Sequence, residues 1–183
     1  MGAKIYGGTS IGDGCKVGGE VNNAVIFSNS NKGHEGFLGN SVIGEWCNIG
    51  ADSNTSNMKN NYGNINVWSY ANEGYVDTGL QFCGLIMGDH SKCGINTMFN
   101  TGSVVGVSSA IFGGGFVPKF VPSFVWGDMA GHFTEYVFDK AIETSERMMA
   151  RRNRKLHTTD SSVLKHIFEI SDTYRKKLNP TRH

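Results

Sequence analysis

The chain has 183 residues, of which 39% are hydrophobic and 18% are charged, a composition typical of globular proteins and not of disordered ones. Its net charge of +1 gives no general case for nucleic-acid or membrane-surface binding, and no run approaches the ~20 apolar residues of a membrane-spanning helix. Residues 1–135 carry 6 Lys or Arg and 10 Asp or Glu, whereas residues 136–183 carry 11 and 6, so the basic end could meet an anionic ligand.

An apolar residue recurs at about every sixth position over the first 115 residues. The ladder comprises Ile5, Ile11, Val17, Leu38, Ile43, Ile49, Met87, Cys93, Phe99, Val105 and Ile111. Glycine often follows the ladder residue, and a small residue often lies four positions after it. A period of six is neither helical nor a simple strand alternation, but it suits short strands joined by tight turns and stacked in coils. The pattern predicts a mainly β fold, a left-handed parallel β-helix of hexapeptide repeats over residues 1–115.

Two stretches interrupt this period and are predicted to leave the coil as inserted loops. One is SNSNKGHEG at 28–36, and the other is the Asn-rich and then aromatic stretch at 54–80. Within the second, VWSY and GYV on either side of ANE predict a small hairpin. Because insertions in solenoids often form the binding face, both stretches are candidate walls of a site.

After the repeat, the Gly/Pro-rich segment 116–131 predicts an exit from the β-helix, and 132–183 predicts a helical segment. Two helices are expected there. One has an apolar stripe through Val137, Ala141, Met148 and Met149, and the other through Val163, Ile167, Ile170 and Tyr174. Thr159 and Asp160 are candidate N-caps of the second.

The four cysteines, Cys15, Cys47, Cys83 and Cys93, form no CxxC pair, and the first ten residues contain no apolar signal region. We therefore expect free thiols in a reducing cytoplasm, where they act as small apolar residues. His90, Cys83 and Cys93 could alternatively bind a metal, but Cys93 falls on the apolar ladder, so no metal site is predicted.

The segments GHEGFLGNSVIGEWCNIGAD (33–52) and NNYGN (60–64) resemble the acetyltransferase half of bifunctional GlmU-type enzymes. Five further segments resemble the divergent Bacteroidetes-type GlmU-like sugar nucleotidyltransferases even more closely. These are GGEV (18–21), SNKGH (30–34), GEWCN (44–48), GLQFCGLIMGDHSKCGINTMFNTG (79–102) and ERMMARR (146–152). GlmU-type enzymes pair a nucleotidyltransferase domain, which has no counterpart in this chain, with a left-handed β-helix. The β-helix acetylates glucosamine 1-phosphate from acetyl-CoA on the way to UDP-N-acetylglucosamine, a cell-wall precursor.

The resemblance implies a role for each of the matching residues. His34 would be the general base, since a histidine can accept the amine proton near neutral pH; Glu20 or Glu35 could orient it. The residues implied for the amino-sugar phosphate are Asn48, Phe37 (where the family usually has Tyr), Asn61, Tyr62 and Lys4, with Lys16 as a further candidate. Those implied for acetyl-CoA are Ala51, Asn61, Gly113, Arg151 and Arg152, with Arg154 as an alternative.

The resemblance also implies a homotrimer with sites between subunits. The predicted function is therefore acetyl-CoA-dependent N-acetylation of an amino-sugar phosphate, with glucosamine 1-phosphate as the favoured acceptor. Two alternatives stay open. One is N-acylation of another amino sugar or sugar nucleotide, and the other is a non-catalytic trimerising or regulatory module of a sugar nucleotidyltransferase.

Overall fold

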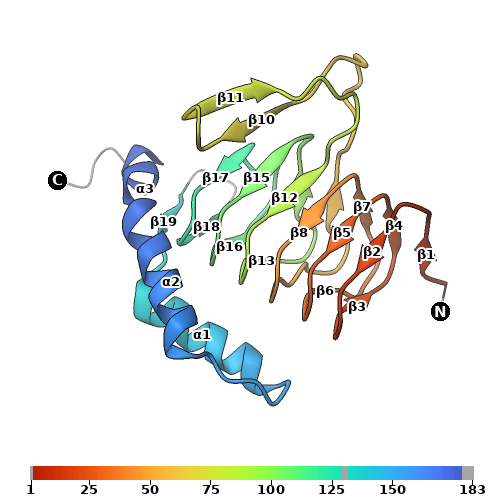
Figure 1. The fold of residues 1–183 in the computed structure, drawn as a ribbon. Coiled ribbons are helices and arrows are strands. Elements are labelled where there is room, and N and C mark those ends of the chain that lie inside the picture. Colours follow the sequence, from red (N-terminus) through yellow and green to blue (C-terminus); the bar gives the residue numbers. More distant parts are fainter. Residues whose placement is uncertain (1, 129–131, 179–183) are drawn as a thin grey trace.

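The structure is a computed structural model that describes residues 2–128 and 132–178. Short parallel strands wind in coils stacked one on another, and helices lie at the end of the stack away from the N-terminus (Figure 1). The predicted fold class, a left-handed parallel β-helix followed by α-helices, is confirmed.

Three strand-lined faces make up each coil. Face one contains β1 (Lys4–Ile5), β4 (Glu20–Asn22), β7 (Phe37–Gly39), β9 (Asn54–Thr55) and β14 (Met98–Phe99). Face two contains β2 (Ser10–Ile11), β5 (Val25–Ile26), β8 (Val42–Ile43), β12 (Leu85–Met87), β15 (Ser103–Val105) and β17 (Phe120–Val121). Face three contains β3 (Lys16–Val17), β6 (Asn31–Lys32), β13 (Lys92–Cys93), β16 (Ala110–Phe112) and β18 (Val125–Asp128), and β19 (Thr134–Glu135) joins it antiparallel to β18.

The apolar ladder forms the core of the solenoid. From Leu38 to Ile111 every ladder residue is at most 5% exposed, whereas Ile5 and Ile11 are 46% and 42% exposed because no other described coil covers the first one. Small polar side chains fill the corners, where the buried hydroxyls of Ser30 and Ser91 donate to the carbonyl oxygens of Gly44 and Gly106 on the next coil. The period of six thus arises because large apolar residues alternate with small polar ones, the former on the faces of the coil and the latter at its corners.

The structure corrects three predicted boundaries. Asn31–Lys32 forms β6 within the predicted loop 28–36, so only the turn 33–36 is irregular, and Asn54–Thr55 forms β9, so the second insertion spans 56–84. The predicted exit segment 116–131 instead contains β17 and β18 and continues the solenoid to residue 128; residues 129–131 lie outside the described part. Pro118 and Pro122 lie outside these two strands, so their missing N–H groups cost no ladder bonds there.

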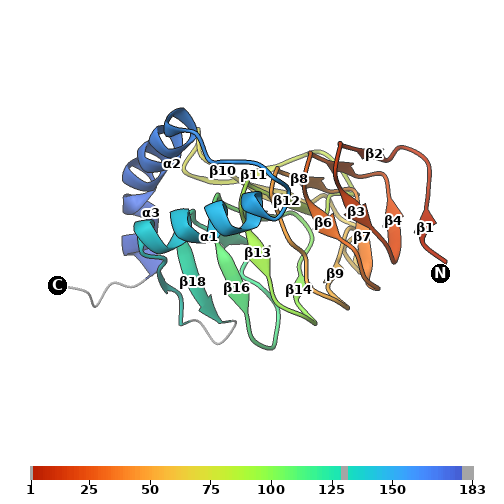
Figure 2. The ribbon, with the colours of Figure 1, turned by 90° about the horizontal axis from the view of Figure 1, so that it is seen from below.

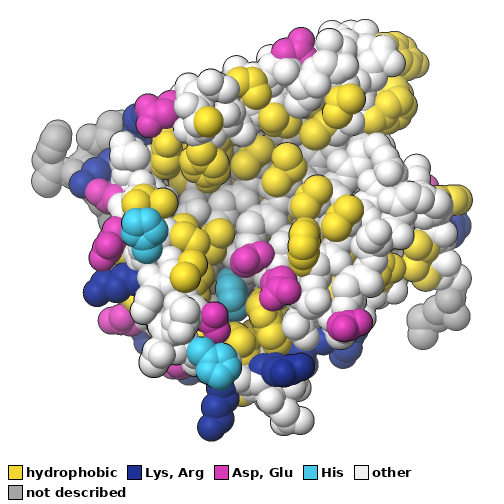
Figure 3. All heavy atoms as spheres, in the orientation of Figure 1, with side chains coloured by type: hydrophobic (Ala, Val, Ile, Leu, Met, Phe, Trp, Pro, Cys, Tyr) yellow, Lys and Arg dark blue, Asp and Glu magenta, His cyan; other side chains and the backbone are white. Residues whose placement is uncertain are grey.

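The predicted hairpin is confirmed as β10 (Asn66–Ser69) paired antiparallel with β11 (Gly74–Asp77). It overhangs face two, where Trp68 stacks on Phe120 with ring centroids 4.3 Å apart, and Lys119 Nζ donates to Asn66 O. Beneath it lies an apolar groove of about 480 Å³ bordered by Ile86, Ile170 and Tyr174. Hydrophobic side chains gather around this overhang in Figure 3.

The part of the chain described after residue 131 contains three helices, not the two that were predicted: α1 (Phe138–Ala150), α2 (Thr158–Ile170) and α3 (Asp172–Leu178). The residues of the second predicted stripe are shared between two helices, with Tyr174 in α3 and the others in α2. At the end of α2, Ser171 Oγ donates to Ile167 O and Phe168 O. The N-cap of α2 is His157, and Asp160 lies three residues inside, where its carboxylate accepts from His157 N. Figure 2 shows α1 running along the solenoid beside β13 and β16, which places it against face three.

Candidate functional site

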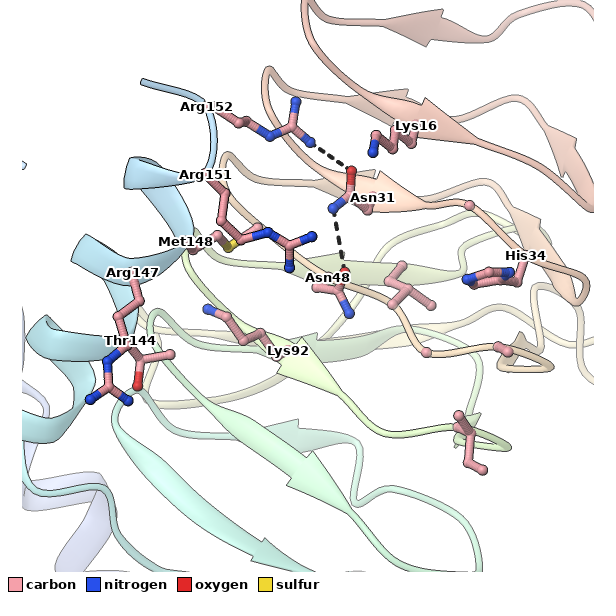
Figure 4. A pocket seen from close by; sticks show the side chains of 15 residues that line it. Lys16, Asn31, His34, Asn48, Lys92, Thr144, Arg147, Met148, Arg151 and Arg152 are labelled. Carbon is pink, nitrogen blue, oxygen red and sulfur yellow. Dashed lines mark hydrogen bonds between the residues drawn. The ribbon is translucent and has the colours of Figure 1, made fainter. Parts of the chain in front are cut away.

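A pocket of about 850 Å³ lies between face three and α1. Residues of face three, of the corner between faces three and one, and of α1 line it. They are Lys16, Asn31, Gly33, His34, Asn48, Ile49, Gly50, Ala51, Lys92, Ile95, Thr144, Arg147, Met148, Arg151 and Arg152. In Figure 4, His34 lies at one end and the arginines of the helical segment lie at the other.

The floor of the pocket is a column of four polar residues on successive coils of face three. Lys16 pairs in parallel register with Asn31, Asn31 with Asn48, and Asn48 with Lys92. Adjacent coils in such a ladder lie about 4.8 Å apart, so the column forms a continuous row. The roof comes from one side of α1, where Thr144, Met148 and Arg151 follow at helical spacing.

A chain of hydrogen bonds fixes the direction of the two amides in the floor. Arg152 donates through its guanidinium to Asn31 Oδ1 at 2.8 Å, and Asn31 Nδ2 donates to Asn48 Oδ1 at 3.4 Å. Because a guanidinium can only donate, the atom of Asn31 that it contacts must be the oxygen, and the remaining order follows. The NH₂ group of Asn48 is then left to donate into the pocket. Arg152 also donates to the carbonyl oxygen of Gly14, which ties the end of α1 to the first coil.

His34 lies in the four-residue turn between β6 and β7, and this turn is held from below. The side chain of Lys32 is 2% exposed, and its ammonium group donates to His34 O at 2.7 Å and Gly18 O at 3.0 Å. Burial lowers the pKa of Lys32, an effect opposed by the charges of Glu35 and Asp52. Gly36 adopts φ +111°, and a Cβ atom there would lie 2.1 Å from Ser53 O, so only glycine fits.

The imidazole of His34 is exposed and bonds to no residue in the described part of the chain. Neither acidic candidate orients it, since Glu20 instead lies 4.0 Å from Lys4 Nζ. Within the described part of the chain, neither Glu20 nor Glu35 therefore orients the imidazole as expected.

Lys92 is the most buried charged group in the floor. Its ammonium group donates to His90 O at 2.7 Å, and burial lowers its pKa to about 8. Across the described ranges, no carboxylate pairs with Lys92, Lys16, Arg151 or Arg152, whereas Arg147 pairs with Glu143 at 2.5 Å. The pocket therefore presents several cations that have no anionic partner among the residues described.

Some of the predicted site residues line the pocket, and the others lie elsewhere in the chain. His34, Asn48, Ala51, Arg151, Arg152 and the further candidate Lys16 meet in this pocket. Gly113 lies at the same corner as His34 and Ala51, farther along the solenoid, with φ +95°. Lys4 and Phe37 lie on face one, and Asn61 and Tyr62 lie in the insertion, outside the pocket. Arg154 lines a separate hollow beside Trp46.

Sequence reasoning missed Asn31, Lys92 and Arg147. Asn31 and Lys92 each directly precede an inward-facing residue of face three, at the outward position that Asn48 also occupies. Arg147 precedes Arg151 by one helical turn. A search for polar residues next to the inward positions would have found the first two.

Other predicted features concern metals, thiols and membranes. No group of three or more His, Cys, Asp or Glu side chains in residues 2–128 and 132–178 is arranged to hold a metal ion. All four cysteines are free, and Cys47 and Cys93 are buried in the solenoid core, as expected. None of the helices described is long and apolar enough to span a membrane.

Comparison with known proteins gives partial matches. No protein-family model matches the chain. A bifunctional protein GlmU from Methanococcus aeolicus is 34% identical over 92 residues, which are 50% of this chain and 22% of that protein. A GlmU from Synechococcus elongatus is 25% identical over 122 residues, 66% of this chain and 23% of that protein. The chain therefore spans about a fifth of the length of these relatives.

Two further similarities are to acetyltransferases. A putative uncharacterized acetyltransferase, YaiX, from Escherichia coli is 30% identical over 100 residues, 54% of this chain and 43% of that protein. Among solved structures, a hexapeptide-repeat acetyltransferase from Vibrio cholerae, complexed with acetyl coenzyme A, aligns over 70% of this chain and 69% of its own, with 15% identity and a TM-score of 0.32.

Proposed function

We propose that this chain is an acetyl-CoA-dependent N-acetyltransferase that acts on an amino-sugar phosphate, with glucosamine 1-phosphate as the favoured acceptor. The observation that carries the proposal is the position of His34, which opens onto the same pocket as Asn48, Ala51 and Arg151. The partial similarity to proteins named GlmU and to a putative acetyltransferase supports the same class of reaction.

The reaction requires a neutral amine, a thioester carbon close to it, and donors for the oxyanion that forms. In the proposed mechanism, His34 removes a proton from the amine as its nitrogen bonds to the thioester carbon. The oxyanion then collapses, the carbon–sulfur bond breaks, and the departing CoA thiolate takes the proton that His34 had accepted, so that CoA leaves as its thiol. General-base catalysis by a histidine contributes about 10²–10⁴-fold.

The backbone N–H of Ala51 is the proposed donor to the oxyanion or to the thioester oxygen. The amides on either side are already used, because Gly50 N donates to Cys93 O and Asp52 N donates to Glu35 O. The N–H of Ala51 has no acceptor among the residues described, and Ala51 lines the pocket. An extended cofactor arm following this corner would pass the turn at Ile95 and Asn96 and then reach Gly113. Arg151 and Arg152 are the proposed contacts for the phosphates of CoA.

We further propose that the enzyme is a homotrimer, because Lys4, Phe37, Asn61 and Tyr62 do not reach the pocket of their own chain. A second copy could bring them to it. An apolar surface on face two also supports association. Val25, Val42 and Ile86 lie in register on successive coils, point outward, and are 37–40% exposed.

Light scattering after gel filtration tests the assembly. Val42→Lys should convert trimers into smaller species, whereas Val163→Lys, a matched change at an exposed residue of α2, should leave the trimer intact. A monomeric wild-type protein would contradict the proposal.

Since the four free thiols suit a reducing compartment, we place the protein in the cytoplasm.

Release of the CoA thiol tests the reaction. Acetyl-CoA and glucosamine 1-phosphate are incubated with wild type, His34→Gln and His166→Gln, the last being an exposed histidine of α2 outside the pocket. We expect release by wild type and His166→Gln, and at least a 10²-fold loss in His34→Gln. Equal release by all three would remove His34 from the mechanism.

The acceptor is then varied across other amino sugars and nucleotide-linked sugars. If the CoA thiol is released only with one of these acceptors, the proposal of an N-acetyltransferase stands and that acceptor replaces glucosamine 1-phosphate as its substrate. No release with any acceptor, together with no change in unfolding temperature on adding CoA, would instead favour a non-catalytic module.

A further inference from the structure

The charged side chains that line the pocket under α1 are all lysines and arginines. Lys16, Lys92, Arg151 and Arg152 carry full positive charges, and Asn48 presents its NH₂ group for the reason given above. None of the described residues that line the pocket is an aspartate or a glutamate. Such a surface favours a ligand that is rich in negatively charged oxygen atoms.

The cations are spread along the floor and do not converge on one point. Lys16 and Lys92 are separated by three coil steps, about 14 Å between their Cα atoms. Figure 4 shows them on either side of the amide pair, with Arg151 beside that pair on the side of the helical segment. One phosphate group would leave part of this row without an anion, whereas two linked phosphates could contact the lysines, Asn48 and Arg151 together.

The burial of Lys92 makes this arrangement costly for the empty protein. Its ammonium group is largely removed from water and has one neutral acceptor, His90 O. A buried charge without a counter-charge is unfavourable, and a ligand phosphate would supply that charge. Lys92 therefore indicates a binding site and not an incidental surface cation.

We propose that the floor between Lys16 and Lys92 is a subsite for a diphosphate group. Its role rests on the proposed function, in which the diphosphate belongs either to CoA or to a nucleotide-linked amino sugar as acceptor. The binding itself does not require that function, because inorganic pyrophosphate contains the recognised group.

Isothermal titration calorimetry tests the subsite on the full chain. Wild type is titrated with inorganic pyrophosphate and, separately, with inorganic phosphate, beside Lys16→Met, Lys92→Met and the control Lys165→Met. Lys165 is an exposed lysine of α2 that does not line the pocket. We expect pyrophosphate to bind at least 10-fold more tightly than phosphate. Each pocket variant should weaken pyrophosphate at least 10-fold, the loss expected for one charge-assisted contact, and Lys165→Met should not.

Competition identifies the source of the diphosphate. Displacement of pyrophosphate by CoA assigns the subsite to the acetyl donor, and displacement by UDP but not by CoA assigns it to a nucleotide-linked acceptor. Displacement by neither, equal affinity for phosphate and pyrophosphate, or wild-type affinity in both pocket variants would overturn the proposal.

The same titration on His34→Gln separates this inference from the proposed reaction. If the subsite exists, His34→Gln binds pyrophosphate as wild type does, whether or not thiol release is ever observed. Conversely, thiol release by wild type without pyrophosphate binding would retain the transferase and remove the subsite.

Discussion

Replacing Lys92 by methionine should stabilise the unliganded protein even though it damages the proposed subsite. Burial is the main cause that lowers the pKa of this lysine from 10.5 to about 8, and the nearby Cys47 opposes it. A difference of about 2.5 units corresponds to roughly 3 kcal/mol against the charged form at neutral pH. Methionine has a similar length and no charge, so it removes this penalty.

Part of the gain is offset because the substitution also removes the hydrogen bond to His90 O, which contributes about 1–2 kcal/mol. The net expectation is a rise of about 1–2 kcal/mol in the free energy of unfolding at pH 7. Urea unfolding in a phosphate-free buffer measures it, with Lys165→Met as the control that should stay within about 0.5 kcal/mol of wild type.

The pH dependence gives the prediction its sign. Because the folded pKa of Lys92 lies below the unfolded value, the unfolded chain binds more protons between about pH 8 and 10.5. Wild-type stability therefore rises relative to Lys92→Met across this window, and the advantage of the variant shrinks. A variant that is less stable than wild type at pH 7, with a difference that does not change up to pH 10.5, would refute the reasoning.

Two further substitutions test the turn below the site and the attachment of α3. Gly36→Ala should cost about 2–4 kcal/mol of stability for two reasons. The new Cβ would lie 2.1 Å from the carbonyl oxygen of Ser53 on the next coil, and the residue has a φ of +111°, which is strained for alanine. Gly33→Ala, with nothing closer than 3.9 Å, should change stability by less than about 0.5 kcal/mol in the same thermal unfolding assay. Arg175→Ala should cost about 2–3 kcal/mol, because this 5% exposed residue loses its packing on the Phe168 ring, whereas its ion-pair partner Glu135 is 38% exposed and stays solvated. Lys176→Ala replaces a 76% exposed side chain and should leave the free energy of unfolding in urea nearly unchanged. Equal losses of stability in Arg175→Ala and Lys176→Ala would contradict the role of Arg175 in attaching α3.

The repeat could be predicted from sequence because its inward positions are filled by one chemical class. Where an inward position holds a charged residue in place of an apolar one, the predicted boundary of the repeat was wrong. Lys32 pairs with Val17 at an inward position of face three, so a charged residue interrupts the apolar ladder and its segment was interpreted as an insertion. The fold accommodates Lys32 because its stem packs inside while its ammonium group bonds to carbonyl oxygens at the corner.

The sequence alone could group site residues only where they lie close together in the chain, whereas Arg151 and Arg152 were predicted through the family resemblance. His34, Asn48 and Ala51 belong to one short motif on adjacent coils. Lys92 lies one coil beyond Asn48 in space, yet the insertion 56–84 separates them in sequence and hides the regular spacing. The position of α1 across face three depends on tertiary packing, so no local pattern could assign Arg151 to the same pocket as His34.

The helical segment does more than cover the pocket, because Arg152 determines what the floor can recognise. Its guanidinium fixes the direction of Asn31, and Asn31 in turn fixes Asn48 as a donor toward the ligand. If α1 were displaced, Asn31 could rotate and Asn48 could present its oxygen, which would repel an anion. Docking of α1 and the donor character of the floor are therefore coupled. A diphosphate that binds the floor must also stabilise the contact between α1 and the first coils, because both depend on the same guanidinium.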